Sequence, residues 1–314
     1  MKLLLTGSAS HLARSLLPRL CADTRIKQII GVDLKPAFLS HAKYQHHQID
    51  IRQRDQLQAL MPGMDALIHL AFVVMPGDLK KNRFDRELIR DINVNGSRQV
   101  FELACEFRLS SLLHLSSAAV YGAWPDNPPQ MTETQPLRAM PGFAYAEDKV
   151  AVEQILDELQ QRSDAPRIVR LRPHVILGQH AQPLLLYLLR QPFYPRFDDP
   201  QPLTQCVWEE DVSDGILRAL FSTHHGAFNL AADPPLPFRE MIRQQHRISF
   251  GLPFPLINAL HRWLWKFSGA AGDPAWNKGM QYHLAVSSQR AHSLLGWKPQ
   301  KSTTEILSTT RQWR

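Results

Sequence analysis

The sequence is poor in cysteine and has no long apolar run. Its three cysteines, Cys21, Cys105 and Cys206, lie far apart and form no CxxC pair. A disulfide framework is therefore not indicated, and free thiols are typical of a reducing cytoplasm. No apolar stretch reaches the roughly 18 residues that a membrane span needs, and the apolar start is too short for a signal peptide. These absences predict a cytoplasmic protein.

Charge is not concentrated in any one segment. The formal net charge is +7, but the basic residues are scattered, so nucleic-acid binding is not indicated. Five histidines could suggest a metal: His41, His46, His47, His224 and His225. Their spacing matches no helical ligand pair, and we expect no metal site. The 314 residues, 44% of them hydrophobic, predict a globular protein with one large domain and a smaller lobe.

The N-terminal segment has the pattern of a dinucleotide-binding unit. An apolar run over 2–5 stops at Thr6-Gly7, a helical pattern follows, and a second apolar run ends at Asp33, 26 residues after Gly7. A glycine turn brings the backbone to a pyrophosphate, and a helix N-terminus faces its charge. The acid accepts hydrogen bonds from ribose hydroxyls and repels a 2′-phosphate. The pattern therefore favours NAD over NADP.

The glycine turn departs from the usual pattern at one position. Against GxxGxxG, the second glycine is Ser10 and the third is Ala13. Alanine is tolerated at the third position. A serine side chain at the second position stands where the pyrophosphate should come close, so we expect a shifted loop or a reduced affinity. A plain strand-to-helix turn is the alternative interpretation.

Strand-like and helix-like segments alternate through the first half of the chain. Apolar segments at 44–49, 66–70, 111–117 and 167–171 are separated by helical patterns, of which the longest run over about 86–107 and 145–159. This alternation predicts an α/β fold, a Rossmann-type doubly wound parallel sheet. In such a sheet the functional groups gather at the carboxyl ends of the strands.

The pattern loosens after residue 173, which suggests a domain boundary. We expect residues 1–172 to form the NAD-binding Rossmann domain, with 209–232 returning to it. Residues 173–208 and 233–314 would then form a smaller, mixed C-terminal lobe that binds the substrate. The segments that would choose the substrate, about 76–85, 124–141 and 180–206, do not reveal its chemistry.

A tyrosine and a lysine four residues apart could carry proton transfer. Tyr145 and Lys149 would share one face of a helix, and serines at 116 and 117 precede them by about thirty residues. A free tyrosine, with a pKa of about 10, is a poor base at neutral pH, but a neighbouring ammonium lowers that pKa. Such a tyrosine can take a proton from an alcohol or give one to a carbonyl oxygen. The pair alone is common by chance in helices.

A set of motifs in fixed order makes the chain similar to a known family. They are TGSASHLA at 6–13, HLA at 69–71, NVNG at 93–96, LSSAAVYG at 115–122, YAEDK at 145–149 and LRPHVILG at 171–178. Together they resemble the extended short-chain dehydrogenase/reductase family, which includes NAD-dependent epimerases and dehydratases. The resemblance covers nearly the whole chain.

The resemblance implies roles for individual residues. Tyr145 would be the acid/base, Lys149 would lower its pKa and hold the nicotinamide ribose, and Ser117 would hydrogen-bond the reacting oxygen. The residues with an implied part in cofactor binding are Gly7, Ser10, His11, Leu12, Asp33, Asp50, Ile51, Leu70, Ala71, Asn93, Ser116, Tyr145, Lys149 and Pro173.

We therefore expect an NAD-dependent oxidoreductase that transfers hydride at a secondary alcohol or ketone. An NAD-dependent nucleotide-sugar epimerase is the alternative, although Val175 stands where many such enzymes carry an asparagine. Ala118 and Ala119 make dehydration less favoured, and a non-catalytic scaffold or sensor is the second alternative. The expected partners are a small-molecule substrate and a second copy, paired through helices at 93–107 and 143–161. The apolar segment 250–267 is expected to line the substrate lobe or a dimer face rather than to contact a membrane.

Overall fold

The computed structural model describes residues 1–74, 85–183, 185–186, 193–197, 202–245, 248–268, 277 and 281–312. The chain divides into two compact units. The first unit comprises Met1–Ser116, Asp148–Arg172 and Ser213–Phe228, and the second comprises Ser117–Glu147, Pro173–Val212 and Asn229–Arg314. Most of the segment 76–85, which was expected to help choose the substrate, lies outside the described residues, as does part of 180–206.

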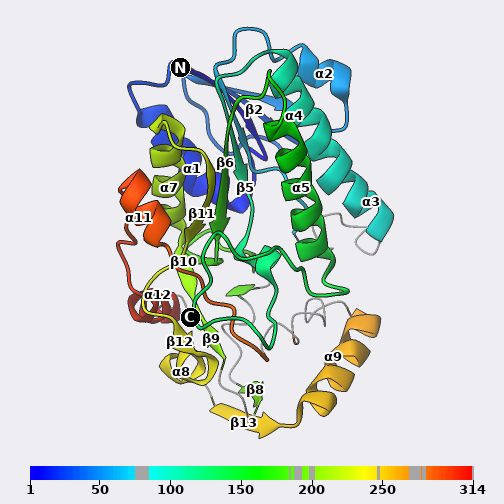
Figure 1. Ribbon diagram of the computed structural model, residues 1–314, viewed down its shortest axis with the longest axis vertical. Helices are drawn as coiled ribbons and strands as arrows, with labels where there is room; N and C mark the ends of the chain where they lie inside the picture. The colour runs from blue at the N-terminus through cyan, green and yellow to red at the C-terminus, as the bar shows by residue number, and fades with distance from the viewer. Residues whose placement is uncertain are drawn as a thin grey trace. The chain divides into compact units, whose positions relative to one another are not determined.

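A seven-stranded sheet in the order β11-β6-β5-β4-β1-β2-β3 forms the centre of the fold (Figure 1). The strands are β1 (Lys2–Thr6), β2 (Gln28–Asp33), β3 (Tyr44–Gln48), β4 (Ala66–His69), β5 (Ser111–Leu115), β6 (Arg167–Pro173) and β11 (Gly226–Leu230). Neighbours from β3 to β6 pair in parallel. Leu3, Leu4 and Leu5 are all buried because parallel strands are covered on both faces. The predicted Rossmann-type sheet is confirmed.

Helices cover both faces of this sheet. The helices that accompany the strands of the sheet are α1 (His11–Ala22), α2 (Arg54–Gln58), α3 (Arg86–Arg90), α4 (Ser97–Glu106), α5 (Ala144–Gln160) and α7 (Glu209–Phe221). Figure 1 shows α1 and α7 on one side and α4 and α5 on the other. The hydroxyls of Ser15 and Ser213 join α1 to α7 at 3.0 Å. On the opposite face, Val100 and Ile155 pack with Leu4 in one apolar cluster.

The helix expected over 86–107 is interrupted by a π-helix, Asp91–Gly96, which separates α3 from α4. Buried Asn93 lies in this turn and makes two hydrogen bonds to the backbone of Val73. A π turn accommodates one extra residue, and such turns are common near functional sites. A single helical period read from the sequence does not reveal this insertion.

The second unit is smaller in its sheets and mixed in character, as predicted. Strands β7 (Val175–Leu177) and β10 (Cys206–Trp208) are parallel, as are β8 (Phe193–Phe197) and β13 (Ile248–Leu252), whereas β9 (Leu203–Thr204) and β12 (Leu236–Pro237) are antiparallel. Its helices include α8 (Phe238–Gln244), α9 (Phe254–Ser268), α11 (Gln289–Leu295) and α12 (Thr303–Arg311). In the described part of the chain, no helix has the length and hydropathy to cross a membrane.

The observed units differ from the expected boundaries at residues 117–147. This segment was expected in the first domain, but it belongs to the second unit. Backbone hydrogen bonds explain the difference, because Met131 donates to Ala285 and accepts from Ser287, each at 2.8 Å. Likewise, only Ser213–Phe228 of the expected return segment 209–232 lies in the first unit. The substrate-binding role of the second unit stays a prediction.

The apolar faces that suggested a helix-paired dimer are used within the chain. Val100 and Phe101 of α4 and Val152 and Ile155 of α5 are buried in the cluster over the sheet. On the exposed side, Arg98 of α4 pairs with Glu158 of α5 at 3.4 Å, and both side chains are solvated. The homodimer stays a prediction that amphipathic periodicity alone does not support.

Candidate active site

The turn after β1 is shaped by a close approach of two strand ends. Gly7 has φ +71°, and a Cβ built on it would lie 2.5 Å from the backbone nitrogen of Ala71. The Leu70 amide in turn donates to the Thr6 carbonyl at 3.0 Å. A residue with a side chain does not fit this contact. The turn therefore has the tight geometry that a dinucleotide-binding loop requires, and Leu70 and Ala71 lie beside it as expected.

Asp33 and Ser10 organise the same turn. One Asp33 oxygen accepts from the Ala9 amide and the other from the Lys35 amide, both at 2.9 Å. Ser10 is the N-cap of α1, with its hydroxyl turned back to the Ala13 amide at 3.4 Å. The serine thus replaces the usual glycine with a helix-capping group. Asp33 stands at the end of β2, where a ribose can reach the rest of its carboxylate.

The other residues of this region that were expected to bind the cofactor are partly buried or already paired within the chain. His11 and Leu12 open α1, and Leu12 is buried. Ile51 is buried in the core cluster. Asp50 follows β3 and is held by Arg52, with Nη2 and Oδ2 2.7 Å apart. Burial tends to raise the pKa of Asp50, but the hydrogen bonds from Arg52 hold it below its ordinary value. The part of these residues in cofactor binding stays a prediction.

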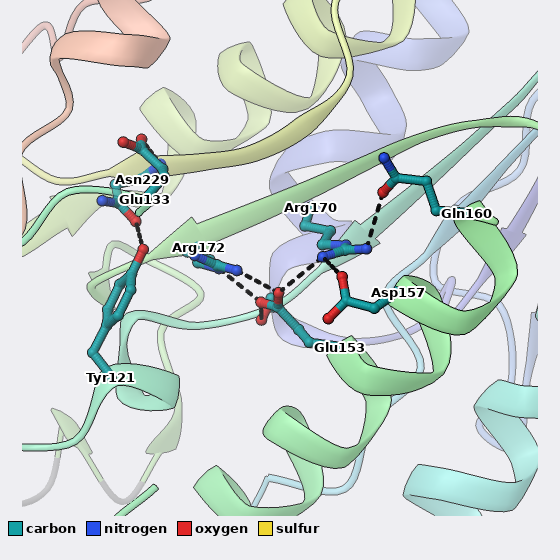
Figure 2. A network of polar contacts seen from close by, with 9 residues as sticks. Tyr121, Glu133, Glu153, Asp157, Gln160, Arg170, Arg172 and Asn229 are labelled. Carbon is teal, nitrogen blue, oxygen red and sulfur yellow. Dashed lines mark hydrogen bonds and ion pairs between the residues drawn. The ribbon is translucent and has the colours of Figure 1, made fainter. Parts of the chain in front are cut away.

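Ser116 belongs to a buried ionic network rather than to an open site. Its hydroxyl donates to Glu153 at 2.5 Å, and Arg172 binds the same carboxylate through Nε at 2.8 Å and Nη2 at 2.5 Å. Figure 2 shows Arg170 beside this pair, bound to Asp157 at 2.6 Å. The hydroxyl proton of Ser116 is committed to Glu153, so the structure gives no support to the expected cofactor contact through this side chain.

The Glu153 carboxylate is charged despite its burial. Burial alone would raise the pKa of Glu153. Arg172, Ser116 and Arg170 lower this pKa by more than burial raises it, so the pKa lies below the ordinary value. A buried charge that is paired and hydrogen-bonded in this way is stable only while its partners remain. The network fixes the strand β6, which carries Arg170 and Arg172, against helix α5.

Asn93 and Asp148 form a second buried network. The Asn93 amide donates to Asp148 at 3.1 Å and to the Val73 carbonyl at 3.2 Å, and its oxygen accepts from the Val73 amide. Asp148 also binds Arg86 at 2.6 Å and Arg90 at 3.1 Å. The Asn93 side chain, expected at the cofactor, is thus engaged in holding the chain after β4.

Lys149 is buried and lies close to the carboxyl end of β5. Its Nζ donates to the Leu115 carbonyl at 2.6 Å and lies 3.6 Å from the centre of the Phe72 ring. Burial lowers the pKa of Lys149 to about 7, although the carboxylates of Glu153 and Asp148 act in the opposite direction. The lysine can therefore change its charge near neutral pH.

Tyr145 and Ser117 both belong to the second unit. Ser117 is close enough to lower the pKa of the Tyr145 phenol, and its side chain accepts from the Ala119 amide at 3.2 Å. Burial raises the pKa of Tyr145, and Ser117 only partly offsets this. The expected lowering of this pKa by Lys149 is not found, because burial is the largest effect and Lys149 is not among the groups that shift this pKa. Tyr145 and Lys149 lie four residues apart in α5, as predicted.

Several polar residues of these networks were not predicted. Asp148, Glu153 and Arg172 lie in or beside the recognised motifs, but only their burial reveals their function in support of the site. In the second unit, Tyr121 donates to Asn229 at 2.7 Å, as Figure 2 shows. Buried Pro173 ends β6, and Val175 is exposed beyond it. Among the described residues, no three His, Cys, Asp or Glu side chains gather as metal ligands would.

The sheet order, the glycine turn and the acid at the end of β2 define a Rossmann-type dinucleotide-binding protein. A family model described as the NAD dependent epimerase/dehydratase family matches residues 3–192, and the chain belongs to this family. It is a family of enzymes that use NAD. The fit of the turn at Gly7 and of Asp33 agrees with NAD as the cofactor.

Curated and solved proteins resemble the chain over most of its length. A UDP-glucose 4-epimerase of Streptococcus mutans is 24% identical over 345 aligned positions, covering 100% of this chain and 96% of that protein. A dTDP-glucose 4,6-dehydratase of Streptomyces venezuelae, solved with NAD, has a TM-score of 0.76 at 19% identity, covering 100% and 96% of the two chains. A UDP-glucose 4-epimerase of Thermotoga maritima, solved with UDP-glucose, has a TM-score of 0.75 at 16% identity, covering 100% and 98%.

Proposed function

We propose that the protein is an NAD-dependent oxidoreductase that converts a secondary alcohol to a ketone, or the reverse. The nearness of Ser117 to Tyr145, with Lys149 on the next turn of the same helix, carries this proposal. These residue types can exchange a proton with a substrate oxygen. NAD, held at the Gly7 turn and at Asp33, supplies the hydride acceptor.

The chain's own contribution is the movement of one proton. In the oxidation direction, the alcohol proton passes to the Tyr145 oxygen as the carbon–oxygen bond becomes a carbonyl. In the reduction direction, Tyr145 returns that proton to the oxygen, which becomes the alcohol. Ser117 supports the proposal as a second hydrogen-bonding group for the same oxygen. Lys149 supplies positive charge that stabilises the tyrosinate, provided that it is protonated.

The variant Tyr145→Phe tests the proposal directly. It removes the proton-transferring oxygen and keeps the ring, so turnover should fall by at least about a thousandfold while NADH binding stays within about twofold. Ser117→Ala should lower turnover less, because Tyr145 remains. Fluorescence titration with NADH measures binding, and absorbance of NADH measures turnover. Unchanged turnover in Tyr145→Phe would remove the assigned acid/base.

A nucleotide-sugar epimerase is the second candidate, and the full-length similarity to the Streptococcus mutans UDP-glucose 4-epimerase favours it. An epimerase oxidises and reduces the same carbon in one cycle, so it produces no net NADH. The purified protein should then retain NAD, and UDP-glucose should be converted to its 4-epimer without a change in NADH absorbance. Net formation of NADH with a simple secondary alcohol, and no conversion of UDP-glucose, would favour the oxidoreductase.

A further inference from the structure

Helix α9 exposes an apolar face. Leu256, Leu260, Trp263 and Leu264 are 54%, 51%, 59% and 38% exposed. Their spacing of four, three and one residues places them on one side of the helix. Ile257 is buried at 7% exposure and lies seven residues before Leu264, at the edge of this face. The helix therefore contacts the protein along one edge of a face whose other large apolar side chains are exposed.

The strand that leads into α9 has the same property. Ile248 and Phe250 of β13 are 66% and 45% exposed, and their spacing of two places them on one side of the strand. Of the nine large apolar side chains that are exposed in the described part of the chain, these six lie within 248–264. Single exposed apolar residues are ordinary, but such a concentration marks an interaction surface.

The sequence around this surface is basic. Between Glu240 and Asp273 it has no acidic residue and four basic ones, Arg243, Arg247, Arg262 and Lys266, of which Arg243 is paired with Glu240 at 3.0 Å. Arg262 is exposed beside Trp263. A second copy of the chain would bring the same positive charge to a symmetric interface, where like charges repel. An anionic partner that can also accept apolar side chains fits better.

We propose that α9 and β13 dock the protein on the surface of an anionic lipid bilayer. Leucine and tryptophan on one face with basic residues beside them are typical of helices that lie in the plane of a membrane interface. Arg262 adds attraction to acidic headgroups. The 15-residue helix would lie on the bilayer without crossing it. None of the side chains of this surface is among those assigned to proton transfer.

Sedimentation with lipid vesicles tests the proposal with the full chain. Vesicles of phosphatidylcholine and phosphatidylglycerol in equal parts should bind the protein, and binding should weaken in high salt and on phosphatidylcholine alone. Leu260→Gln and Trp263→Gln should each lower the partition coefficient about tenfold, because an apolar side chain leaves the interface. Arg262→Gln should lower it about fivefold on the anionic vesicles only.

Leu34→Gln is the matched control, because Leu34 is 53% exposed but lies in the first unit. It should leave vesicle binding unchanged, and circular dichroism should show that every variant is folded. Absent binding of the natural chain, or equal losses in Leu34→Gln and Leu260→Gln, would overturn the proposal. If vesicles do not bind the protein, light scattering should be used to look for a dimer. A dimer that Leu260→Gln converts to a monomer would show that a second copy of the chain covers this face.

Discussion

The Ser116 hydroxyl donates a hydrogen bond to the buried Glu153 carboxylate at 2.5 Å, whereas the hydroxyl of its neighbour Ser117 accepts from the Ala119 amide at 3.2 Å. Two adjacent serines therefore have different surroundings. Ser116 completes the shell of a buried charge together with Arg172, and Ser117 stays half-buried beside the tyrosine. The ionic network thus fixes the backbone immediately before the serine that is proposed to meet the substrate.

Arg172→Met should destabilise the protein by about 3 kcal/mol at pH 7, because Glu153 would lose its bidentate partner in a buried position. Urea denaturation measures the change. The control is Arg162→Met, whose partner Asp164 is exposed to solvent, and it should change stability by less than about 1 kcal/mol. Equal losses of stability in the two variants would show that the buried pair of Arg172 and Glu153 contributes no more to stability than the exposed pair of Arg162 and Asp164.

Lys149→Met should alter how stability depends on pH. Lys149 has a pKa of about 7 in the folded protein and an ordinary value of 10.5. Between these two pH values the unfolded chain binds more protons than the folded protein, so this lysine makes the stability of the protein rise with pH. Below about pH 7 the destabilisation caused by burying Lys149 reaches its full value. The variant should gain stability over the natural chain as pH falls from about 10 to 7, by a few kcal/mol. A constant difference would contradict the low pKa.

Gly7→Ala should disrupt the nucleotide turn. The new Cβ would overlap the backbone of Ala71, and the residue would keep a positive φ, so we expect a loss of about 3–5 kcal/mol together with weaker NADH binding. Gly142 has φ +82° with no atom within 4 Å of its Cβ position. Gly142→Ala should therefore cost only the backbone strain, about 1–2 kcal/mol. Thermal unfolding and NADH titration distinguish the two variants.

The proposed oxidation and reduction should respond to pH in opposite ways. The pKa of Tyr145 is above its ordinary value, so the side chain is protonated at neutral pH. Oxidation of an alcohol needs the deprotonated form and should accelerate as pH rises toward that pKa, whereas reduction of a ketone should slow there. Initial rates of NADH formation and consumption across the alkaline range measure this. Parallel profiles for the two directions would exclude Tyr145 as the group that titrates.

Long elements with strong patterns were predictable from the sequence. The strand at 2–5, the helix with Leu12 and Leu16, and the helix after Tyr145 all appear in the structure, because burial of one face or both imposes a regular apolar spacing. Strands β9 and β12 were missed because each has two residues and pairs only with a distant segment. The placement of 117–147 in the second unit depends on long-range backbone pairing that no local pattern encodes.

The candidate site was predictable in its residue types but not in its electrostatics. Tyr145, Ser117 and Lys149 followed from spacing and resemblance. The partner of Ser116 lies 37 residues away, and the charge states of Glu153 and Lys149 depend on burial, which the sequence does not give. The pKa of Tyr145 was expected to fall and instead rises, because the effect of burial exceeds that of Ser117.

The π turn at Asp91–Gly96 changes the direction in which side chains point along one continuous helix, which runs from α3 to α4. One added residue rotates everything that follows by about 100° relative to an uninterrupted helix. Before the shift, Arg86 and Arg90 point to Asp148, and after it Val100 and Phe101 point into the core. If a single residue were removed here, the arginines before the turn and the apolar residues after it could not both keep their directions. The number of residues in this helix is therefore constrained as well as their types.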